Sequence, residues 1–422
     1  MKYVIVGNSA AAIGAVEGIR KSDKESPITL ISDEPYHTYS RPLISYYLAG
    51  KVSQEKMYYR KPDFYSQNGV EAILGVKAEK LNTAERIVTL ADGRSIEYDK
   101  LLISTGGRPF VPPGLDVNKL NTFSFIKLDD VKAIEKLAKP GSKTVIIGAG
   151  LIGLKAAEGL AKLGVDITVV ELANRVLSAI LDEEAAAFVQ QQLEEHQVKF
   201  ELNTTVDQVL GNEQVTGVTL KNGKQLDCDF LIVAIGVVPN TELVKDTDVR
   251  VNRGIVVDDS MATNVSGVYA AGDVSEGYDL IYKTQRVLPI LPNAYQQGEN
   301  AGENMAGAEK AYKGGFAMNA IGFFDYPMIT AGIIKPEGDD FEILVDSDSE
   351  GKSYKKIVLK NNTVVGFIYL NKVDRAGIVR GLIREEADVS KFKAELLKDD
   401  FGYINMSSEE RAAKLLKGGR SA

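Results

Sequence analysis

Two glycine-rich stretches of the chain have the residue types and the spacing that bind a phosphorylated nucleotide. The second of them reads Gly148-Ala149-Gly150-Leu151-Ile152-Gly153, between an apolar run at 144–147 and a helical pattern that continues to about residue 163. In such a turn the first glycine permits the tight bend, the second lets a pyrophosphate approach the backbone, and the third lets the helix pack on the strand. The helix N-terminus, with its free N–H groups and its dipole, favours phosphate. We therefore predict a dinucleotide site at Gly148, Gly150, Ile152 and Gly153.

An acidic residue at the end of the next strand-like run selects the dinucleotide. Glu171 follows the run 167–170 and lies 23 residues after Gly148. A carboxylate at this place binds both ribose hydroxyls and repels a 2′-phosphate, which favours NAD(H) over NADP(H). The alternative is a glycine-rich turn that happens to lie near a surface glutamate.

The first glycine-rich stretch is a degenerate copy of the second, 141 residues upstream. Gly7 is kept, Ser9 and Ala12 replace the second and third glycines, and Ala10 lies in the expected first helical turn. Because these residues are small, a pyrophosphate can still approach the backbone closely. The ribose would be held by Asp33 or Glu34, 26 and 27 residues after Gly7. A remnant that binds nothing is the alternative.

A third motif indicates which dinucleotide the first copy binds. The run 263–273 is strand-like and ends in Gly272-Asp273, where the carboxylate can accept a hydrogen bond from a polyol hydroxyl. Together with the two glycine turns and the run Thr105-Gly106-Gly107-Arg108-Pro109, it resembles the second FAD fingerprint of flavoprotein reductases, which implies FAD as the first cofactor. We assign Thr105, Gly106, Arg108, Gly272 and Asp273 to that site.

The elements that position these residues repeat in the same order. Each half begins with an apolar strand, a glycine turn, a helix and a second strand. A later apolar strand in each half then ends in glycine, at Gly106 in the first half and at Gly236 in the second. Strands that alternate with helices predict parallel sheets. Beyond residue 312 the pattern changes to antiparallel strands at 341–345, 355–359 and 364–370, and then to helices near 376–384, 390–398 and 408–416. The predicted fold class is α/β, with two Rossmann-like three-layer domains and an α+β C-terminal domain.

Composition excludes several other classes of protein. The 422 residues carry 50 Lys and Arg against 58 Asp and Glu, a net charge of −8, which argues against a general nucleic-acid binder. The single cysteine excludes an internal disulfide, an intrinsic iron–sulfur cluster and a cysteine-rich zinc site, and it suits a reducing cytoplasm. The two histidines have no further ligand pattern, so we expect no metal site. Apolar runs are too short for a membrane span, and the N-terminus lacks the pattern of a signal peptide.

Taken together, these motifs resemble the pyridine nucleotide-disulfide oxidoreductase superfamily over essentially the whole chain. Within it, the chain is most similar to NADH:rubredoxin oxidoreductases, ferredoxin reductases and the flavin modules of nitrite reductases. This similarity rests on Tyr39-Ser40-Arg41-Pro42-Leu43, on Pro239-Asn240 and on the run 293–298. The resemblance implies that Arg41 and Pro42 contact FAD, although a buried salt bridge is an alternative role for Arg41.

The resemblance also implies a domain arrangement. A discontinuous FAD domain would comprise residues 1–112 and 240–312, an NAD domain residues 113–239, and a C-terminal interface domain residues 313–422. A helix is expected over 293–305, and its N-terminus, with Asn293 and Ala294, would face the flavin and place partial positive charge there.

The chain departs from the family pattern at its thiol. Disulfide-reductase-like members carry a redox cysteine where this chain has Pro42, and the sole thiol, Cys228, lies far along the NAD domain between two aspartates. We expect Cys228 to be a small buried side chain. Reduction of disulfides or peroxides through a cysteine is therefore disfavoured.

A second departure concerns charge near the flavin. Family members often carry Glu at the position of Lys155 and pair it with Lys at the position of Tyr46. We hypothesise that Lys155, with Tyr46, stabilises the anionic reduced flavin from the other side. An exposed helix lysine is the alternative.

The predicted function is that of an FAD-dependent NADH:acceptor oxidoreductase in the cytoplasm. Hydride would pass from NADH to flavin N5, and single electrons would then reach rubredoxin, ferredoxin or another iron–sulfur protein. The alternatives are an oxidase or diaphorase that uses O₂ or a quinone, and a non-turnover subunit that binds NAD(H), flavin and a partner. Arg375, Arg380 and Arg384 could dock an acidic redox protein or form a solvated face, and a homodimer is a further arrangement that we consider.

Overall fold

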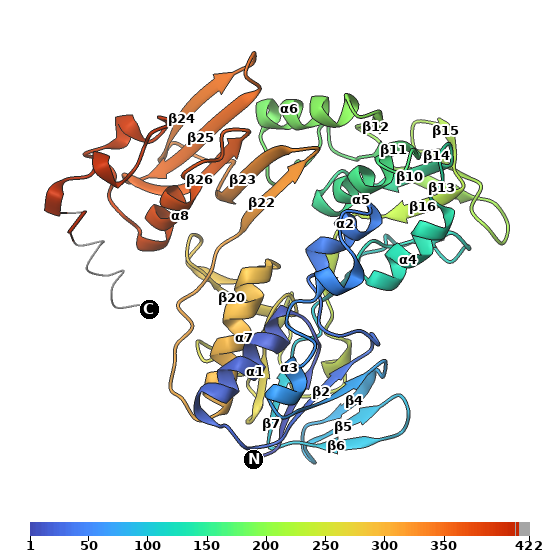
Figure 1. Cartoon of the computed structure of the whole chain (residues 1–422), viewed down its shortest axis with the longest axis vertical. Helices are drawn as coiled ribbons and strands as arrows, with labels where there is room; N and C mark the ends of the chain where they lie inside the picture. Colours follow the sequence, from blue (N-terminus) through green and yellow to red (C-terminus); the bar gives the residue numbers. More distant parts are fainter. Residues whose placement is uncertain (410, 413–422) are drawn as a thin grey trace. The chain divides into compact units, whose positions relative to one another are not determined.

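The computed structural model describes residues 1–409 and 411–412. The chain forms two compact units, of which the first contains residues 1–172 and 198–316 and the second contains residues 173–197 and the segment from Ala317 onward. The ribbon follows these segments by colour along the sequence (Figure 1).

The first unit contains two five-stranded parallel sheets. The sheet nearer the N-terminus has the strand order β19-β7-β1-β2-β3. Its strands are β1 (Tyr3–Val6), β2 (Ile28–Ser32), β3 (Val70–Leu74), β7 (Lys100–Ile103) and β19 (Val268–Ala270). The second sheet has the order β12-β11-β10-β16-β9. Its strands are β9 (Thr122–Phe123), β10 (Lys143–Ile147), β11 (Asp166–Val170), β12 (Val198–Glu201) and β16 (Phe230–Val233).

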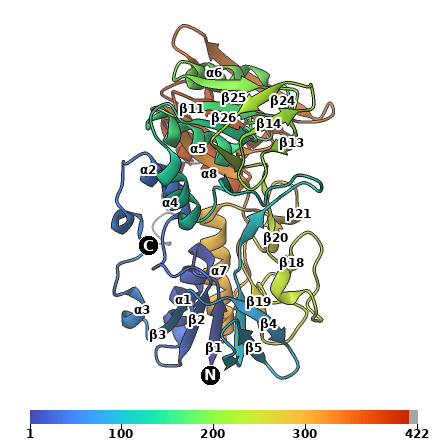
Figure 2. The ribbon, with the colours of Figure 1, turned by 90° about the vertical axis from the view of Figure 1, so that its right-hand side faces the viewer.

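Helices α1 (Ala10–Ser22) and α7 (Leu291–Met305) pack side by side in the first unit (Figure 2). A Cβ atom at Gly298 would lie 1.9 Å from the carbonyl oxygen of Ala11, and one at Gly302 would lie 2.2 Å from that of Ala15. No other residue type leaves room for so close an approach. Two helices about 280 residues apart in the sequence are therefore held in close contact with each other.

The two sheets are joined by a two-stranded antiparallel connector of β8 (Gly107–Pro109) and β17 (Val237–Pro239). Helices α4 (Leu128–Leu137) and α5 (Leu151–Ala161) belong to the second sheet's segment. Three small three-stranded sheets complete the unit. Their strands are β4 (Ala78–Asn82), β5 (Ile87–Leu90), β6 (Ser95–Glu97), β13 (Val206–Leu210), β14 (Gly217–Leu220), β15 (Gln225–Asp227), β18 (Ile255–Val256), β20 (Ser275–Asp279) and β21 (Thr284–Val287). The short helices are η1 (Arg41–Leu43), α2 (Ile44–Leu48), η2 (Gln54–Met57), α3 (Phe64–Gln67) and η3 (Glu242–Val244).

The second unit is built on an antiparallel sheet in the order β22-β23-β26-β25-β24. Its strands are β22 (Met318–Phe323), β23 (Tyr326–Gly332), β24 (Phe341–Asp348), β25 (Ser353–Lys360) and β26 (Thr363–Leu370). It also contains α6 (Glu183–Glu194), α8 (Ala376–Glu385), η4 (Lys393–Glu395) and η5 (Tyr403–Asn405). The Asp182 side chain caps α6 by accepting from the Ala185 N–H, and it also accepts from Lys356 at 2.7 Å, so this helix is anchored to β25.

The two parallel sheets and the antiparallel sheet confirm the predicted fold class. The helix predicted near 376–384 is confirmed, whereas 390–398 contains only the three-residue η4. That segment buries Phe392 and Leu396, and the Phe392 ring stacks on that of Phe401. Tertiary contacts of these side chains replace a regular helix there. The helix predicted over 408–416 lies mostly outside the described residues.

Within the described residues, no helix has the length and apolar character that crossing a membrane requires.

Candidate cofactor and electron-transfer site

The first glycine turn connects β1 to α1 and leaves helix N–H groups available. Gly7 has φ +125°, and a Cβ there would lie 2.2 Å from the carbonyl oxygen of Ser104 on the neighbouring strand's end. Ser9 occupies the N-cap position without a side-chain cap, and Ala10 and Ala12 are buried in the first turn. The first backbone N–H groups of α1 can therefore bind an anion that approaches the turn.

The second glycine turn, between β10 and α5, keeps an open approach to its backbone. A Cβ at Gly148 would lie 2.5 Å from the Ala234 oxygen, and one at Gly153 would lie 2.0 Å from the Gly148 oxygen. At Gly150, in contrast, no protein atom lies within 4 Å of an added Cβ. Gly150 is the position predicted for the approach of a pyrophosphate, and Ile152 follows it in the half-exposed first turn of the helix.

Glu171 is tied to this second turn. Its carboxylate accepts a hydrogen bond from the Ala149 backbone N–H at 2.7 Å, so the acidic residue lies directly beside the glycine turn at the end of β11. This placement agrees with the spacing argument that made Glu171 the candidate for the NAD ribose.

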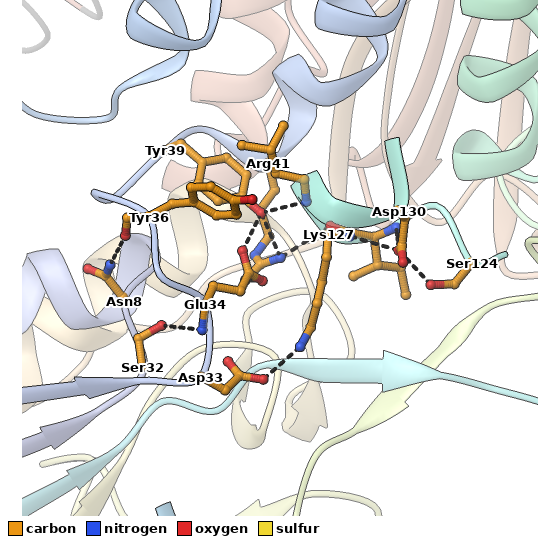
Figure 3. A network of polar contacts seen from close by, with 12 residues as sticks. Asn8, Ser32, Asp33, Glu34, Tyr36, Tyr39, Arg41, Ser124, Lys127 and Asp130 are labelled. Carbon is orange, nitrogen blue, oxygen red and sulfur yellow. Dashed lines mark hydrogen bonds and ion pairs between the residues drawn. The ribbon is translucent and has the colours of Figure 1, made fainter. Parts of the chain in front are cut away.

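The two candidate ribose ligands of the first site have different surroundings (Figure 3). The Glu34 carboxylate is buried and accepts hydrogen bonds from the Tyr39 hydroxyl at 2.6 Å and from Arg41 at 2.8 Å. Burial raises the pKa of Tyr39 above its ordinary value, so its hydroxyl remains a donor. Asp33 is exposed, and its carboxylate pairs with Lys127 at 2.6 Å.

The same network reaches the start of α4. Arg41 donates to the Ile126 carbonyl at 3.1 Å, and the Tyr39 hydroxyl accepts from the Leu128 N–H at 3.1 Å. Asp130 accepts from the N–H groups of Ile126 and Lys127 at 3.0 Å each. Arg41 therefore forms a salt bridge with Glu34. Pro42, the next residue, lies exposed in η1.

The Gly272-Asp273 turn lies between the starts of α1 and α7. A Cβ at Gly272 would lie 3.1 Å from that of Ala11 and 3.5 Å from that of Ala294, and the Gly272 N–H donates to Gln297 at 2.8 Å. Burial raises the pKa of Asp273 to about 6, and the charge of Arg41 opposes this rise. A desolvated carboxylate at this point suits a ligand that supplies hydroxyl donors.

The connector residues meet between the two glycine turns. Thr105 donates to the Asn240 carbonyl at 2.7 Å, and the Asn240 N–H donates to the Gly106 carbonyl at 2.8 Å. No protein atom lies within 4 Å of an added Cβ at Gly106 or Gly236, and the buried Asn240 Oδ1 has no hydrogen-bond partner.

Two further predicted residues lie near these turns in different environments. Arg108 is exposed on β8. Asn293 is buried, and its side chain donates to the Phe316 carbonyl at 3.1 Å, so its amide nitrogen has a structural partner.

Lys155 is buried and not an exposed helix lysine. Its ammonium group pairs with Glu158 and lies 4.6 Å from the centroid of the Tyr46 ring. The two residues predicted to act together are therefore in contact. Glu158 was not predicted, although its i,i+3 spacing from Lys155 on a helix would have indicated it. Tyr39 and Gln297 lie within the runs that carry the family resemblance but were not singled out as site residues, because their bonds to Leu128 and Gly272 join residues far apart in the sequence.

The remaining candidates have structural surroundings. Cys228 is buried, and burial raises the pKa of its thiol to about 12. His37 Nε2 lies 3.0 Å from the Arg60 carbonyl, and its ring packs edge-on against Tyr58 and Tyr65. Arg375 donates to the carbonyls at 400 and 401, so its guanidinium links the start of α8 to the segment after η4. Over residues 1–409 and 411–412 no group of acidic, His and Cys side chains could hold a metal.

Comparison with known proteins agrees with this geometry. Residues 1–298 match the model of the pyridine nucleotide-disulphide oxidoreductase family, and residues 318–387 match the rubredoxin NAD+ reductase C-terminal domain. The chain therefore belongs to the pyridine nucleotide-disulphide oxidoreductase family.

Two curated relatives and one solved structure illustrate the likeness. The chain is 31% identical to the epsilon subunit of NADH-dependent phenylglyoxylate dehydrogenase of Aromatoleum evansii, over 94% of each chain. It is 30% identical to nitrite reductase [NAD(P)H] of Bacillus subtilis over 92% of its own length but only 48% of that protein. The putidaredoxin reductase in the covalent putidaredoxin reductase–putidaredoxin complex has the same fold, with a TM-score of 0.84 and 24% identity over 100% of this chain and 99% of that one.

These findings define an NAD(P)H-dependent flavin oxidoreductase whose cofactors are FAD and NAD(H). The open backbone at Gly150, the desolvated Asp273 and the unpaired Asn240 oxygen fit two dinucleotides in the first unit.

Proposed function

We propose that the protein transfers electrons between NAD(H) and an iron–sulfur protein of the rubredoxin or ferredoxin type, without a redox-active thiol. The observation that supports this best is the state of Cys228, which is buried and whose thiol pKa is raised to about 12 by that burial. Only a thiolate can exchange with disulfides, so this protonated thiol is unreactive near neutral pH. The match to the rubredoxin reductase C-terminal domain supports the class of acceptor.

FAD, when bound, accepts hydride from NADH and releases electrons singly; the chain's residues bind and orient it. We propose that the first backbone N–H groups of α1, after Gly7, Ser9, Ala10 and Ala12, hold its pyrophosphate. Asp33 is the proposed ribose ligand, because Glu34 is already engaged by Arg41 and Tyr39. Arg41 then acts on FAD by its charge and by fixing this loop.

Other residues complete the proposed FAD site. Asp273 would accept hydrogen bonds from the ribityl hydroxyls, and the start of α7 at Asn293 and Ala294 would place partial positive charge beside the flavin. Thr105, Gly106 and Arg108, with Pro42, would line the approach from the connector and from η1.

For the second cofactor, the turn Gly148, Gly150, Ile152 and Gly153 is the proposed pyrophosphate site and Glu171 the ribose ligand. Gly236 leaves space near this turn. Lys155, over Tyr46, is the proposed cation that favours the anionic reduced flavin. These roles orient the two cofactors and stabilise charge, so few groups need to transfer protons.

Anaerobic stopped-flow spectroscopy tests the proposal. NADH should bleach the flavin absorbance without a thiolate charge-transfer band, and oxidised rubredoxin or ferredoxin should restore it faster than O₂ or a quinone. The Cys228→Ala variant should behave as the wild type does. Loss of electron transfer in that variant, or reoxidation only by O₂ or a quinone, would contradict the proposal.

A second candidate is a flavoprotein subunit of a larger assembly. The epsilon-subunit relative, which this chain matches over 94% of both chains, favours it. A subunit of this kind should turn over NAD(H) continuously only in the presence of the other subunits of its assembly. Rapid turnover of the isolated chain with a small iron–sulfur protein would argue against this candidate.

A further inference from the structure

Two lysines from different segments, Lys155 of α5 and Lys51, lie against the ring of Tyr46 in α2. Lys155 Nζ lies 4.6 Å, and Lys51 Nζ 5.2 Å, from the centroid of the Tyr46 ring. The Lys51 backbone N–H donates to the Tyr46 carbonyl at 2.8 Å, which fixes Lys51 just beyond α2. Ammonium groups this close to an aromatic face are attracted by it.

Glu158 connects the two lysines. It lies one turn after Lys155 on α5, so both side chains leave the same face of the helix. One of its carboxylate oxygens contacts Lys155, and the other lies 3.8 Å from Lys51 Nζ. The Lys155 and Glu158 side chains are only 11% and 7% exposed, so water screens their charges weakly.

The packing of α5 on α2 keeps this cluster in place. A Cβ at Gly159 would lie 3.2 Å from both the Ser45 carbonyl oxygen and the Leu48 side chain. The turn of α5 that carries Glu158 is therefore pressed against α2. Lys155 itself follows the last glycine of the NAD turn by two residues.

We propose that Glu158 is a positioning residue whose ion pair with Lys155 restrains the ammonium group and so limits the positive field that Lys155 exerts at the bound flavin. This inference rests on the proposed function, in which Lys155 is the cation that favours the reduced flavin. Glu158 acts through Lys155 and not by contact with the cofactor. Its charge would thus help to set the redox potential of the flavin.

Sulfite titration of the oxidised holoenzyme tests this inference, because sulfite adds to the flavin ring and makes it anionic. Glu158→Gln keeps an oxygen acceptor for Lys155 but removes the charge, so sulfite should bind about tenfold more tightly and the flavin midpoint potential should rise. Lys155→Met should weaken sulfite binding about tenfold, and Lys155→Arg should restore it.

The double variant Glu158→Gln/Lys155→Met separates action through Lys155 from a general structural effect. It should bind sulfite as Lys155→Met alone does. The inference would be overturned if Glu158→Gln had no effect in the wild type, or the same effect in both backgrounds. Lys221→Met, an exposed change just after β14, is the matched control and should change nothing.

Failure of this inference can be told apart from failure of the proposed function. The titration needs neither NADH nor an acceptor protein, so it reports only on charge at the flavin. Loss of rubredoxin or ferredoxin reduction with the predicted sulfite ranking intact would reject the acceptor alone.

Discussion

The two glycine turns of the first unit differ in how their acidic partners are held. At the second turn, Glu171 bonds directly to the turn's own Ala149 N–H, and Gly150 leaves the backbone open. At the first, Ser9 and Ala12 replace two glycines, and Glu34 is buried in a network that reaches the start of α4.

This difference suits two cofactors with different exchange rates. An open turn with few supporting side chains permits a dinucleotide to enter and leave, as a substrate must. The first site has a buried Glu34–Arg41–Tyr39 network and a Gly272-Asp273 turn that lies against Ala11, which suits a permanently bound group.

Replacing the first glycine of the first turn should have the largest effect. Gly7→Ala places a methyl group 2.2 Å from a backbone oxygen at φ +125°. We therefore expect the free energy of unfolding to fall by about 3 kcal/mol and the purified variant to lose its FAD. Gly150→Ala, at a position with open space, should keep stability and FAD content but weaken NADH binding about tenfold. Thermal unfolding, the flavin spectrum and NADH titration measure these effects. An unstable Gly150→Ala variant would contradict the contrast.

Reversing charge at the second site should change which nucleotide is used. Glu171→Arg should shift the NADH to NADPH ratio of kcat/KM about 100-fold toward NADPH, because the carboxylate no longer repels the 2′-phosphate. FAD content should stay unchanged. Glu171→Gln is the control, and it should weaken NADH use without a comparable gain for NADPH. An unchanged preference in Glu171→Arg would mean that another residue binds the ribose.

The two acidic residues of the first site should respond differently to loss of charge. Glu34→Gln leaves Arg41 without its carboxylate, so we expect a loss of about 2 kcal/mol in stability. Asp33→Asn is exposed and should change stability by less than about 0.5 kcal/mol, yet weaken FAD binding about tenfold. Denaturant unfolding and FAD titration of the apoprotein distinguish the two. The reverse pattern would make Glu34 the ribose ligand.

FAD binding should depend on pH through Asp273. Burial raises the pKa of this carboxyl to about 6 in the folded protein, so it gains a proton there at a higher pH than in the unfolded chain. The apoprotein should therefore lose stability as pH rises from about 4 to 6, where the folded state binds more protons than the unfolded one. FAD should bind less tightly as pH falls below 6, by up to about tenfold per pH unit, because the hydroxyls then face a neutral acid.

Asp273→Asn is the matched variant for this pH dependence. It should bind FAD less tightly at pH 7 and show little change in affinity between pH 5 and 7. A wild-type affinity that does not vary over this range would contradict the role of Asp273.

Local patterns were enough to predict the strands and helices on either side of the two glycine turns. The strand–glycine–helix order placed β1, α1, β10 and α5 to within a few residues, because close backbone approaches demand glycine and buried strands demand apolar runs. Three antiparallel strands of the second unit, β24, β25 and β26, followed from alternation and turn residues, whereas β22 and β23 were not predicted. The helix expected near 390–398 failed because side-chain burial, and not periodicity, determines that segment.

Sequence by itself determined the family, the two dinucleotide turns and the absence of a cysteine at residue 42, since these depend on residue types within short windows. Only the tertiary structure decided that Glu34 is engaged by Arg41 while Asp33 is exposed, and that Lys155 is buried with Glu158 and Tyr46. Most of these contacts join residues from different strands, loops and helices. Their energies depend on distance and burial, and neither can be obtained from spacing along the chain.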